Sequence, residues 1–173
     1  MKNIFKGNFS FSSPVILSFL LILLLAVLAL GEYMHLGLAR RTFVFYTVSD
    51  GAVFVENRML KHSRSQEDDL IRYVEETLLG PVSPGLHPLI AGGTKLISLL
   101  FRDGVVYINL SENAAVAQLD GRSVRENFIT FYSGILRNFS FVNDVRFYIE
   151  GNSIFDDEFR REMIQYNEGF FGV

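Results

Sequence analysis

The residues that could perform acid–base or metal chemistry are few and scattered along the chain. The three histidines, His35, His62 and His87, lie far apart, and no two of them have the spacing that places metal ligands on one face of a helix. None stands beside a nucleophile in a recognised catalytic motif. We therefore interpret each histidine as a structural or solvated side chain.

The acidic clusters and one glycine-rich tract have simpler explanations than a ligand site. Glu67-Asp68-Asp69 and Asp156-Asp157-Glu158 lack the alternating oxygen ligands of a calcium loop, and helix N-termini favour such charges. Gly92-Gly93-Thr94-Lys95 has neither the preceding strand nor the following helix of a phosphate loop. The chain has no cysteine, which excludes disulfides and thiolate sites. We assign no catalytic, cofactor-binding or metal-binding residue and expect no enzyme.

The most prominent element is an uninterrupted apolar run at 15–30. With its flanks it forms a segment, 11–38, that reaches the roughly 20 residues a helix needs to cross a bilayer. Lys2 and Lys6 precede the run and Glu32 follows it, which predicts a cytoplasmic N-terminus, 1–10, and an exported body.

Two other interpretations of this run are a cleaved signal peptide and a buried helix of a soluble protein. A cleavable signal usually has a shorter apolar core that ends in an Ala-x-Ala-like site. Small residues do occur at 26–31, but the core is long. We favour a retained signal anchor, with the chain crossing the membrane once and its C-terminal domain extracytoplasmic.

The body of the chain has the size and charge of one mildly acidic domain. The whole chain carries −3 and residues 1–39 carry +1, so residues 40–173 carry −4. This argues against nucleic acid as a partner, because binding it needs a basic stripe. Seventeen Phe and seven Tyr without Trp predict a core packed with aromatic rings.

Local patterns predict the first half of the body as a hairpin and a helix. Strands at 42–48 and 52–60 flank a Ser-Asp-Gly turn. A helix at 65–79 begins with a capping pattern, Ser63 with Gln66 or Ser65 with Asp68, and Gly80-Pro81 ends it. Its predicted buried stripe consists of Leu70, Ile71, Val74 and Leu78.

The second half repeats this order. Asp103-Gly104 predicts a tight turn between strands at 94–102 and 105–110. Ser123 and Glu126 form a capping box that opens a helix ending near Asn138. A strand at 143–150 follows, and the tail includes a short helix around 156–166. The predicted helix stripe consists of Val124, Phe128, Phe131, Tyr132, Ile135 and Phe139. The expected class is α+β: a small mixed sheet of about five strands with two helices on one face, preceded by one N-terminal transmembrane helix.

Residues 41–151 resemble the GerMN domain, the sporulation and spore-germination domain of bacterial cell-envelope proteins. The likeness lies in the order and spacing of several elements. These are Thr42-Phe43-Val44-Phe45-Tyr46, Leu78-Leu79-Gly80-Pro81, residues 86–93 leading into Thr94-Lys95-Leu96-Ile97-Ser98, Asp103-Gly104-Val105-Val106-Tyr107-Ile108-Asn109-Leu110-Ser111, and Val145-Arg146-Phe147-Tyr148-Ile149-Glu150-Gly151. The resemblance implies an extracytoplasmic, non-enzymatic module similar to the ring-building domains of envelope assemblies. Members are often lipoproteins and some carry two copies of the domain, whereas this chain has no cysteine to lipidate and room for one copy.

The predicted organisation is a cytoplasmic N-terminus (1–10), a signal anchor with its juxtamembrane segment (11–38), a GerMN-like domain (40–151) and a C-terminal tail (152–173). With this resemblance, the leading function is a non-enzymatic, membrane-anchored scaffold or assembly module of the bacterial cell envelope, in the inner (cytoplasmic) membrane. It would associate with an envelope protein or with itself through sheet edges, which leave backbone groups free for strand addition. The alternative is a small-ligand or cell-wall-glycan binding domain, with peptidoglycan as a candidate partner. A hydrolase with an unrecognised polar site is the third interpretation.

Overall fold

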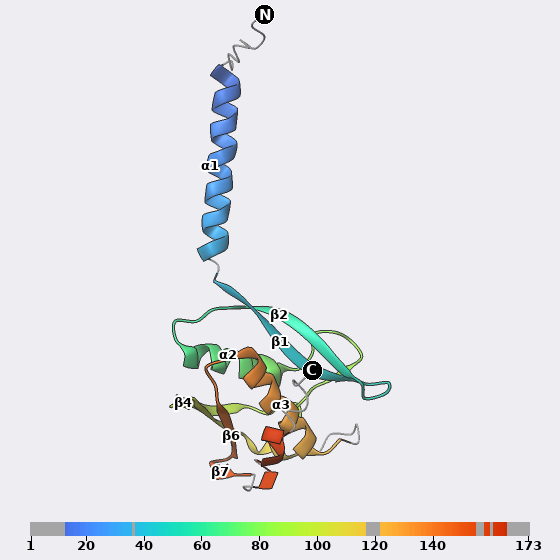
Figure 1. Ribbon diagram of the computed structural model, residues 1–173. Coiled ribbons are helices and arrows are strands. Elements are labelled where there is room, and N and C mark those ends of the chain that lie inside the picture. Colours follow the sequence, from blue (N-terminus) through green and yellow to red (C-terminus); the bar gives the residue numbers. More distant parts are fainter. Residues whose placement is uncertain (1–12, 36, 117–121, 155–157, 160, 166–173) are drawn as a thin grey trace, which may run out of the picture. The chain divides into compact units, whose positions relative to one another are not determined.

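The computed structural model describes residues 13–35, 37–116, 122–154, 158–159 and 161–165 (Figure 1). It divides into two compact units, residues 1–37 and 38–173. In the first unit, helix α1 (Ser13–His35) contains the window Pro14–Gly31, with a mean hydropathy of 2.9 and no buried residue. By length and composition α1 is able to cross a membrane, and a signal sequence would have the same properties.

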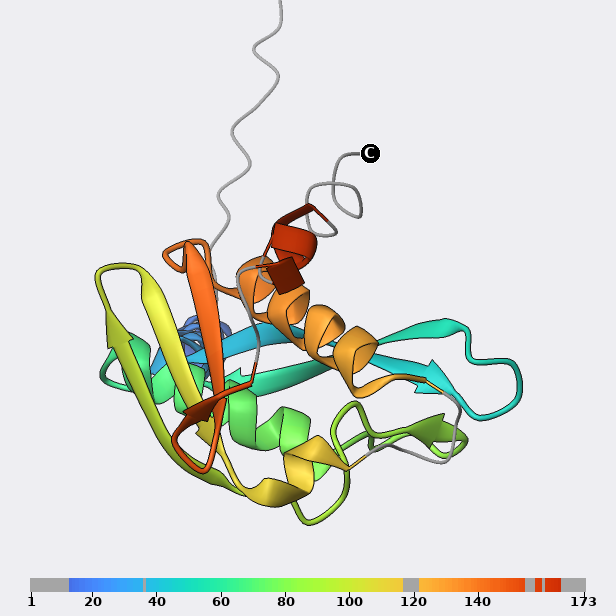
Figure 2. The same cartoon turned by 90° about the horizontal axis from the view of Figure 1, so that it is seen from below.

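The second unit is an α+β domain with two sheets, which confirms the predicted class. The first sheet has the order β2-β1-β3 and the second the order β4-β5-β6-β7 (Figure 2). All pairs are antiparallel except β5 with β6, which is parallel. The elements are β1 (Leu38–Thr47), β2 (Val53–Lys61), α2 (Gln66–Leu79), β3 (Leu86–His87), β4 (Leu96–Arg102), β5 (Val105–Leu110), the 3-10 helix η1 (Glu112–Ala115), α3 (Val124–Asn138), β6 (Asp144–Ile149) and β7 (Asn152–Ser153).

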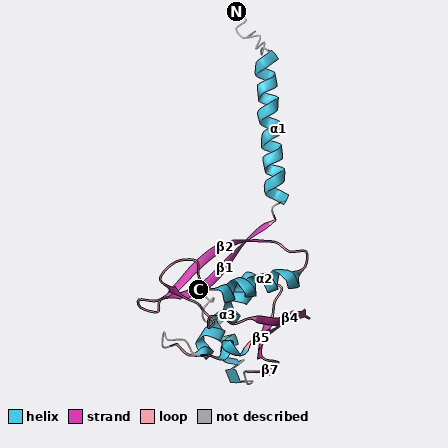
Figure 3. Cartoon of the chain, turned by 180° about the vertical axis from the view of Figure 1, so that it is seen from behind, coloured by secondary structure: helices cyan, strands magenta, loops and turns pink. Residues whose placement is uncertain are grey.

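The strands form two sheets, and not the single mixed sheet of about five strands, because the two helices lie between them. Helices α2 and α3 separate the β1–β2 hairpin from the second sheet (Figures 1 and 3). Helix α3 contacts both β1 and β6, and α2 contacts β4. Each helix therefore buries side chains toward strands of both sheets, where one covered face was expected.

Local turn and cap signals form as predicted. Ser65, the second of the two candidate caps, accepts a hydrogen bond from the Asp68 N–H at 3.1 Å, and α2 ends at Gly80 with φ 85°. Ser123 and Glu126 form a complete capping box at the start of α3. The β4–β5 turn has Asp103 at φ 53° and Gly104 at φ 79°, the positive φ values that a type I′ turn needs.

The core between the sheets is rich in aromatic rings. Phe43 stacks on Tyr73 at 4.7 Å between centroids, and Phe128 meets Phe147 edge-on at 4.9 Å. Such pairs add stability beyond the area they bury. Helix α3 buries every predicted stripe position but Val124, which is half-buried.

The buried face of α2 differs from its predicted stripe. Leu70 and Val74 are buried as expected, whereas Ile71 and Leu78 are only partly buried. Tyr73 and Thr77 take the inner positions instead. Their polar groups can be buried because Tyr73 donates a hydrogen bond to the Thr42 carbonyl and Thr77 donates one to the Tyr73 carbonyl.

The segment after β6 contributes to this domain. Strand β7 pairs with β6, and Phe159 and Met163 belong to the buried core. Residues 158–159 and 161–165 are helical, within the predicted short helix. The rest of that prediction, together with Asp156-Asp157, lies outside the described residues.

Replacing Phe128 by Asp tests the aromatic core. Phe128 has no exposed surface, so the substitution buries an unpaired carboxylate and should lower the free energy of unfolding by more than about 4 kcal/mol. Gln66→Ala, at an exposed position of α2, should change it by less than about 0.5 kcal/mol. Thermal unfolding measures both variants, and comparable losses would contradict the assigned core.

Candidate functional site

Strand β2 lies at an open edge of the first sheet. It pairs with β1 over nine residue pairs, from Leu38↔Lys61 to Tyr46↔Val53. Within the described ranges no strand pairs with its other side. The neighbouring strand β1 pairs with β2 along one side, and on its other side Tyr46 and Thr47 pair with β3. The backbone groups on the outer side of β2 are thus open to strand addition along the whole strand.

Strand β4 is also an edge, but it is less open. A register shift between Leu96 and Ser98 interrupts its pairing with β5. The Glu67 carboxylate accepts a hydrogen bond from the Phe101 N–H at 2.8 Å, so α2 occupies one backbone donor of this strand. Irregular pairing and blocked donors are two ways in which proteins protect a sheet edge.

One face of β2 carries exposed aliphatic side chains. Val53, Val55 and Met59 are 47%, 41% and 54% exposed. They alternate along the strand and so project from the same face. We call these three residues and the unpaired edge of β2 the β2 surface. Aliphatic side chains beside a free edge are the combination that strand addition uses.

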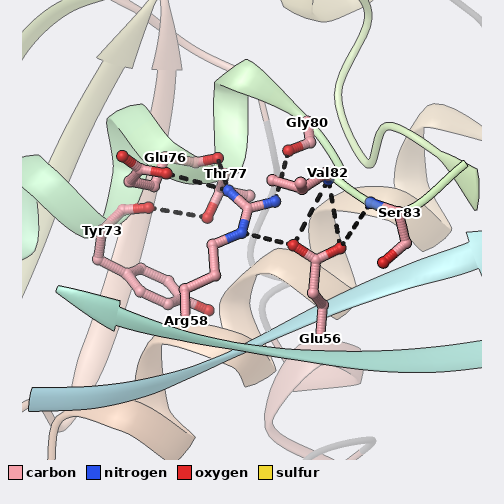
Figure 4. A network of polar contacts seen from close by, with 8 residues as sticks. All are labelled: Glu56, Arg58, Tyr73, Glu76, Thr77, Gly80, Val82 and Ser83. Atoms are coloured by element: carbon pink, nitrogen blue, oxygen red, sulfur yellow. Dashed lines mark hydrogen bonds and ion pairs between the residues drawn. The ribbon is translucent and has the colours of Figure 1, made fainter.

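The opposite face of β2 is fastened to α2 by Arg58 (Figure 4). Its guanidinium donates to Glu56 Oε1 at 2.6 Å, to Glu76 Oε2 at 3.0 Å and to the Gly80 carbonyl at 2.7 Å. It also lies 4.8 Å from the ring centroid of Phe43. The last turn of α2 has no basic residue, so Arg58 supplies the positive charge that favours this helix end.

Glu56 connects the same face to the segment after α2. Its carboxylate accepts hydrogen bonds from the N–H groups of Val82 at 3.2 Å and Ser83 at 3.3 Å. Partial burial raises the pKa of Glu56, but the Arg58 hydrogen bond and these backbone donors outweigh it, and the net pKa is lowered. A lowered folded-state pKa means that the ionised carboxylate stabilises the fold at neutral pH, and that this stabilisation is lost as pH falls through that pKa. Together Glu56, Arg58 and their partners form what we call the Arg58 network.

Two of the sequence candidates, His62 and Asp69, lie together in a structural cluster. His62 Nδ1 is 2.8 Å from Asp69 Oδ2, and the Ser63 N–H donates to Asp69 Oδ1 at 2.6 Å. Burial opposes ionisation of Asp69, but the Ser63 N–H, His62 and Arg41 together lower its pKa. Ser63 Oγ has no hydrogen-bond partner among the described residues, so the nucleophile–base contact of a catalytic triad is not formed here.

The remaining candidates are separated. His87 lies in β3 opposite Tyr46, and His35 ends α1. At the glycine-rich tract, Thr94 bonds the Ala91 carbonyl and the Lys95 N–H bonds Ser111 Oγ, as in a turn that leads into β4. Among the described residues no three His, Asp or Glu side chains are grouped to hold a metal ion.

An open hollow of about 650 Å³ lies between the end of α2 and the start of β4. Its lining is Glu75, Leu78, Leu79, Pro88, Gly92, Gly93, Thr94, Lys95 and Leu96. A ligand site usually adds convergent polar groups to an apolar pocket. Here the two charged side chains stand among aliphatic residues and glycines, without a buried titratable group.

Sequence reasoning missed the residues that position the β2 surface. Glu56 and Arg58 alternate with Val55, Asn57 and Met59, a pattern that normally assigns the charged residues to solvent. In the structure Glu56 and Arg58 lie on the face toward α2, whose C-terminal end supplies polar partners for Arg58, and Val55 and Met59 are exposed on the other face. The available signal was the pair of opposite charges, Glu56 and Arg58, two residues apart in one strand, a spacing that allows them to pair on one face.

Comparisons with known proteins identify relatives of the second unit. A family model described as "Germane: Sporulation and spore germination" matches residues 44–155. The solved tandem GerMN domains of the Bacillus subtilis sporulation protein GerM share 15% identity with this chain, at a TM-score of 0.50. That match covers 68% of this chain and 41% of the tandem structure, so this chain spans about two fifths of it. The first GerMN domain of GerM alone matches at 16% identity and a TM-score of 0.46, covering 67% of this chain and 86% of that domain structure. No curated protein matches the chain.

Proposed function

This chain belongs to the Germane family of sporulation and spore-germination domains, and we propose that it acts as a membrane-anchored, extracytoplasmic association module of the bacterial cell envelope. The observation that carries the proposal is the β2 surface, an edge strand of nine residues with three exposed aliphatic side chains. Such a strand donates and accepts main-chain hydrogen bonds, and its alternating side chains select the partner. The function is binding without chemistry, with an envelope protein or a second copy of the chain as partner.

The anchor is α1. Its 23 residues span about 35 Å at 1.5 Å per residue, enough for a hydrocarbon core about 30 Å thick. The apolar side chains from Val15 to Leu30 are exposed, as expected of a helix that faces lipid and not a protein core. Lys2 and Lys6 precede it and Arg40 and Arg41 follow it, so the proposed export of the C-terminal domain rests on the family, whose likeness implies an extracytoplasmic module.

Retention of this anchor is tested by the mass of the native N-terminus. A retained helix should leave Met1 or Lys2 as the first residue of protein purified from membranes, because 15–30 is long for a cleaved signal core. A mature protein that starts near Gly31 would contradict anchoring by α1.

A small-ligand or cell-wall-glycan binding domain is the second candidate. The hollow beside α2 favours it by size, since ligand pockets usually have volumes of about 300–1,000 Å³. Its aliphatic lining lacks an aromatic platform and a cluster of hydrogen-bonding side chains. Association through the β2 surface therefore explains more of the structure.

Charges placed on the β2 surface should prevent association. The chain has no cysteine, so Asn57→Cys puts one crosslinker on β2 for use in intact envelopes. Val55→Lys with Met59→Lys should abolish the crosslinked product, since lysine on an edge strand opposes strand pairing. Both positions are exposed, so the free energy of unfolding should change by less than about 1 kcal/mol.

The matched control is Ile97→Lys with Leu100→Lys on the partly blocked edge β4, where both side chains are similarly exposed. This variant should keep the crosslinked product. Loss of the product in the β4 variant and its persistence in the folded β2 variant would reject the proposal. If substitutions in the hollow beside α2 remove the crosslinked product and those on β2 do not, the ligand-binding alternative is favoured.

A further inference from the structure

Basic side chains that pair with no described carboxylate gather at the end of the β1–β2 hairpin opposite its turn. Lys61 ends β2 and pairs in register with Leu38, the first residue of β1. Arg40 on β1 and Arg64 in the following loop are exposed at this end, as is Arg72 on α2. The domain as a whole is acidic, so this end departs from the average charge of its surface.

These four cations differ from other arginines of the domain. Arg41, Arg58, Arg125 and Arg146 each lie within 4.0 Å of a carboxylate oxygen. Arg40, Lys61, Arg64 and Arg72 make no such ion pair with any described residue. We call these four residues the basic end of the hairpin.

Three members of the basic end surround one shallow hollow. Lys61, Arg64 and Arg72 line a space of about 380 Å³ together with His62, Ser63, Asp68, Ile71 and Glu75. Asp68 and Glu75 offset part of the charge, and Asp69 is occupied by His62, Ser63 and Arg41. The hollow is large enough for a phosphate group, and guanidinium and ammonium groups are its usual protein ligands.

The basic end is also the end of the domain that is tethered to α1. Helix α1 ends at His35 and β1 begins at Leu38, so two residues join them. At no more than about 3.6 Å per residue, the chain keeps the start of β1 within roughly 11 Å of the end of the helix. If α1 crosses a bilayer, this distance is comparable to the depth of one headgroup layer, about 5–8 Å.

We propose that the basic end of the hairpin binds the phosphate headgroups of anionic phospholipids in the bilayer that α1 crosses. The inference rests on the proposed membrane anchoring, but not on association through the β2 surface. Lys and Arg side chains within a screening length of an anionic bilayer surface are attracted to its headgroups. The contact would hold the hairpin by both its tether and its charges, and so restrict the directions in which the β2 edge points.

The test uses the full chain in lipid nanodiscs, with a fluorophore on Gln66→Cys and a quencher on lipid headgroups. Gln66 is exposed at the start of α2, between two residues that line the hollow. At low salt, quenching should rise about threefold from phosphatidylcholine discs to discs that contain phosphatidylglycerol. Near 1 M salt the rise should disappear, because the screening length falls to about 3 Å.

Matched variants separate the basic end from charge in general. Lys61→Ser with Arg64→Ser should remove the dependence on phosphatidylglycerol, whereas Lys95→Ser with Arg102→Ser, an equal loss of exposed charge elsewhere, should keep it. A label on Ser49→Cys, in the turn at the other end of the hairpin, should show a smaller change than the Gln66 label.

Three outcomes would overturn the inference. They are equal quenching in both kinds of disc, equal effects of the two double variants, and stabilisation by inorganic phosphate in phosphatidylcholine discs without any effect of phosphatidylglycerol. A chain that does not migrate with the discs would instead reject anchoring by α1. Crosslinking through β2 is measured separately, so its failure would leave the lipid result intact.

Discussion

The interaction on which the position of the open β2 edge depends is the contact of one arginine with the end of a helix. Arg58 stands on a strand, yet its guanidinium meets the side chain of Glu76 and the Gly80 carbonyl at the C-terminus of α2. The planar face of the guanidinium lies over the rings of Phe43 and Phe45. Such a partly buried network contributes less net free energy than its contacts imply, but it specifies one geometry, because any shift leaves charges unpaired.

The other strand of the hairpin has its own polar attachment. The side chain of Asn138, the last residue of α3, accepts from the Thr42 N–H at 2.8 Å and donates to the Thr42 carbonyl at 2.7 Å. It thereby replaces a strand partner on the side of β1 where β3 is absent. This pairing covers Thr42, whereas the outer side of β2, which the Arg58 network holds in place, has no described strand partner along its length.

Local signals predicted most elements, whereas contacts between distant residues could not be predicted. The cap at Ser123 and the Asp103-Gly104 turn depend on neighbouring residues, and the sequence alone identified them, while Ser65 was one of its two candidate caps for α2. The division into two sheets depends on the packing of α2 and α3 against strands that are distant in the sequence, which no local pattern encodes. The candidate site was missed for the same reason: Glu56 and Arg58 have the spacing of solvent-facing residues until the end of α2 is placed beside them.

Hydrogen exchange of the Arg58→Ala chain is the most direct test of this account. If Arg58 holds the hairpin on α2, amides of β1 and β2 should exchange roughly 30-fold faster, a loss of about 2 kcal/mol, while β5 and β6 keep their protection. Arg102→Ala is the matched control, because this arginine is 76% exposed and, among the charged groups that the structure describes, pairs with the neighbouring Asp103 alone. It should leave both sheets unchanged. Equal acceleration in both sheets, or none in the hairpin, would contradict the claim that the Arg58 network positions the β2 edge.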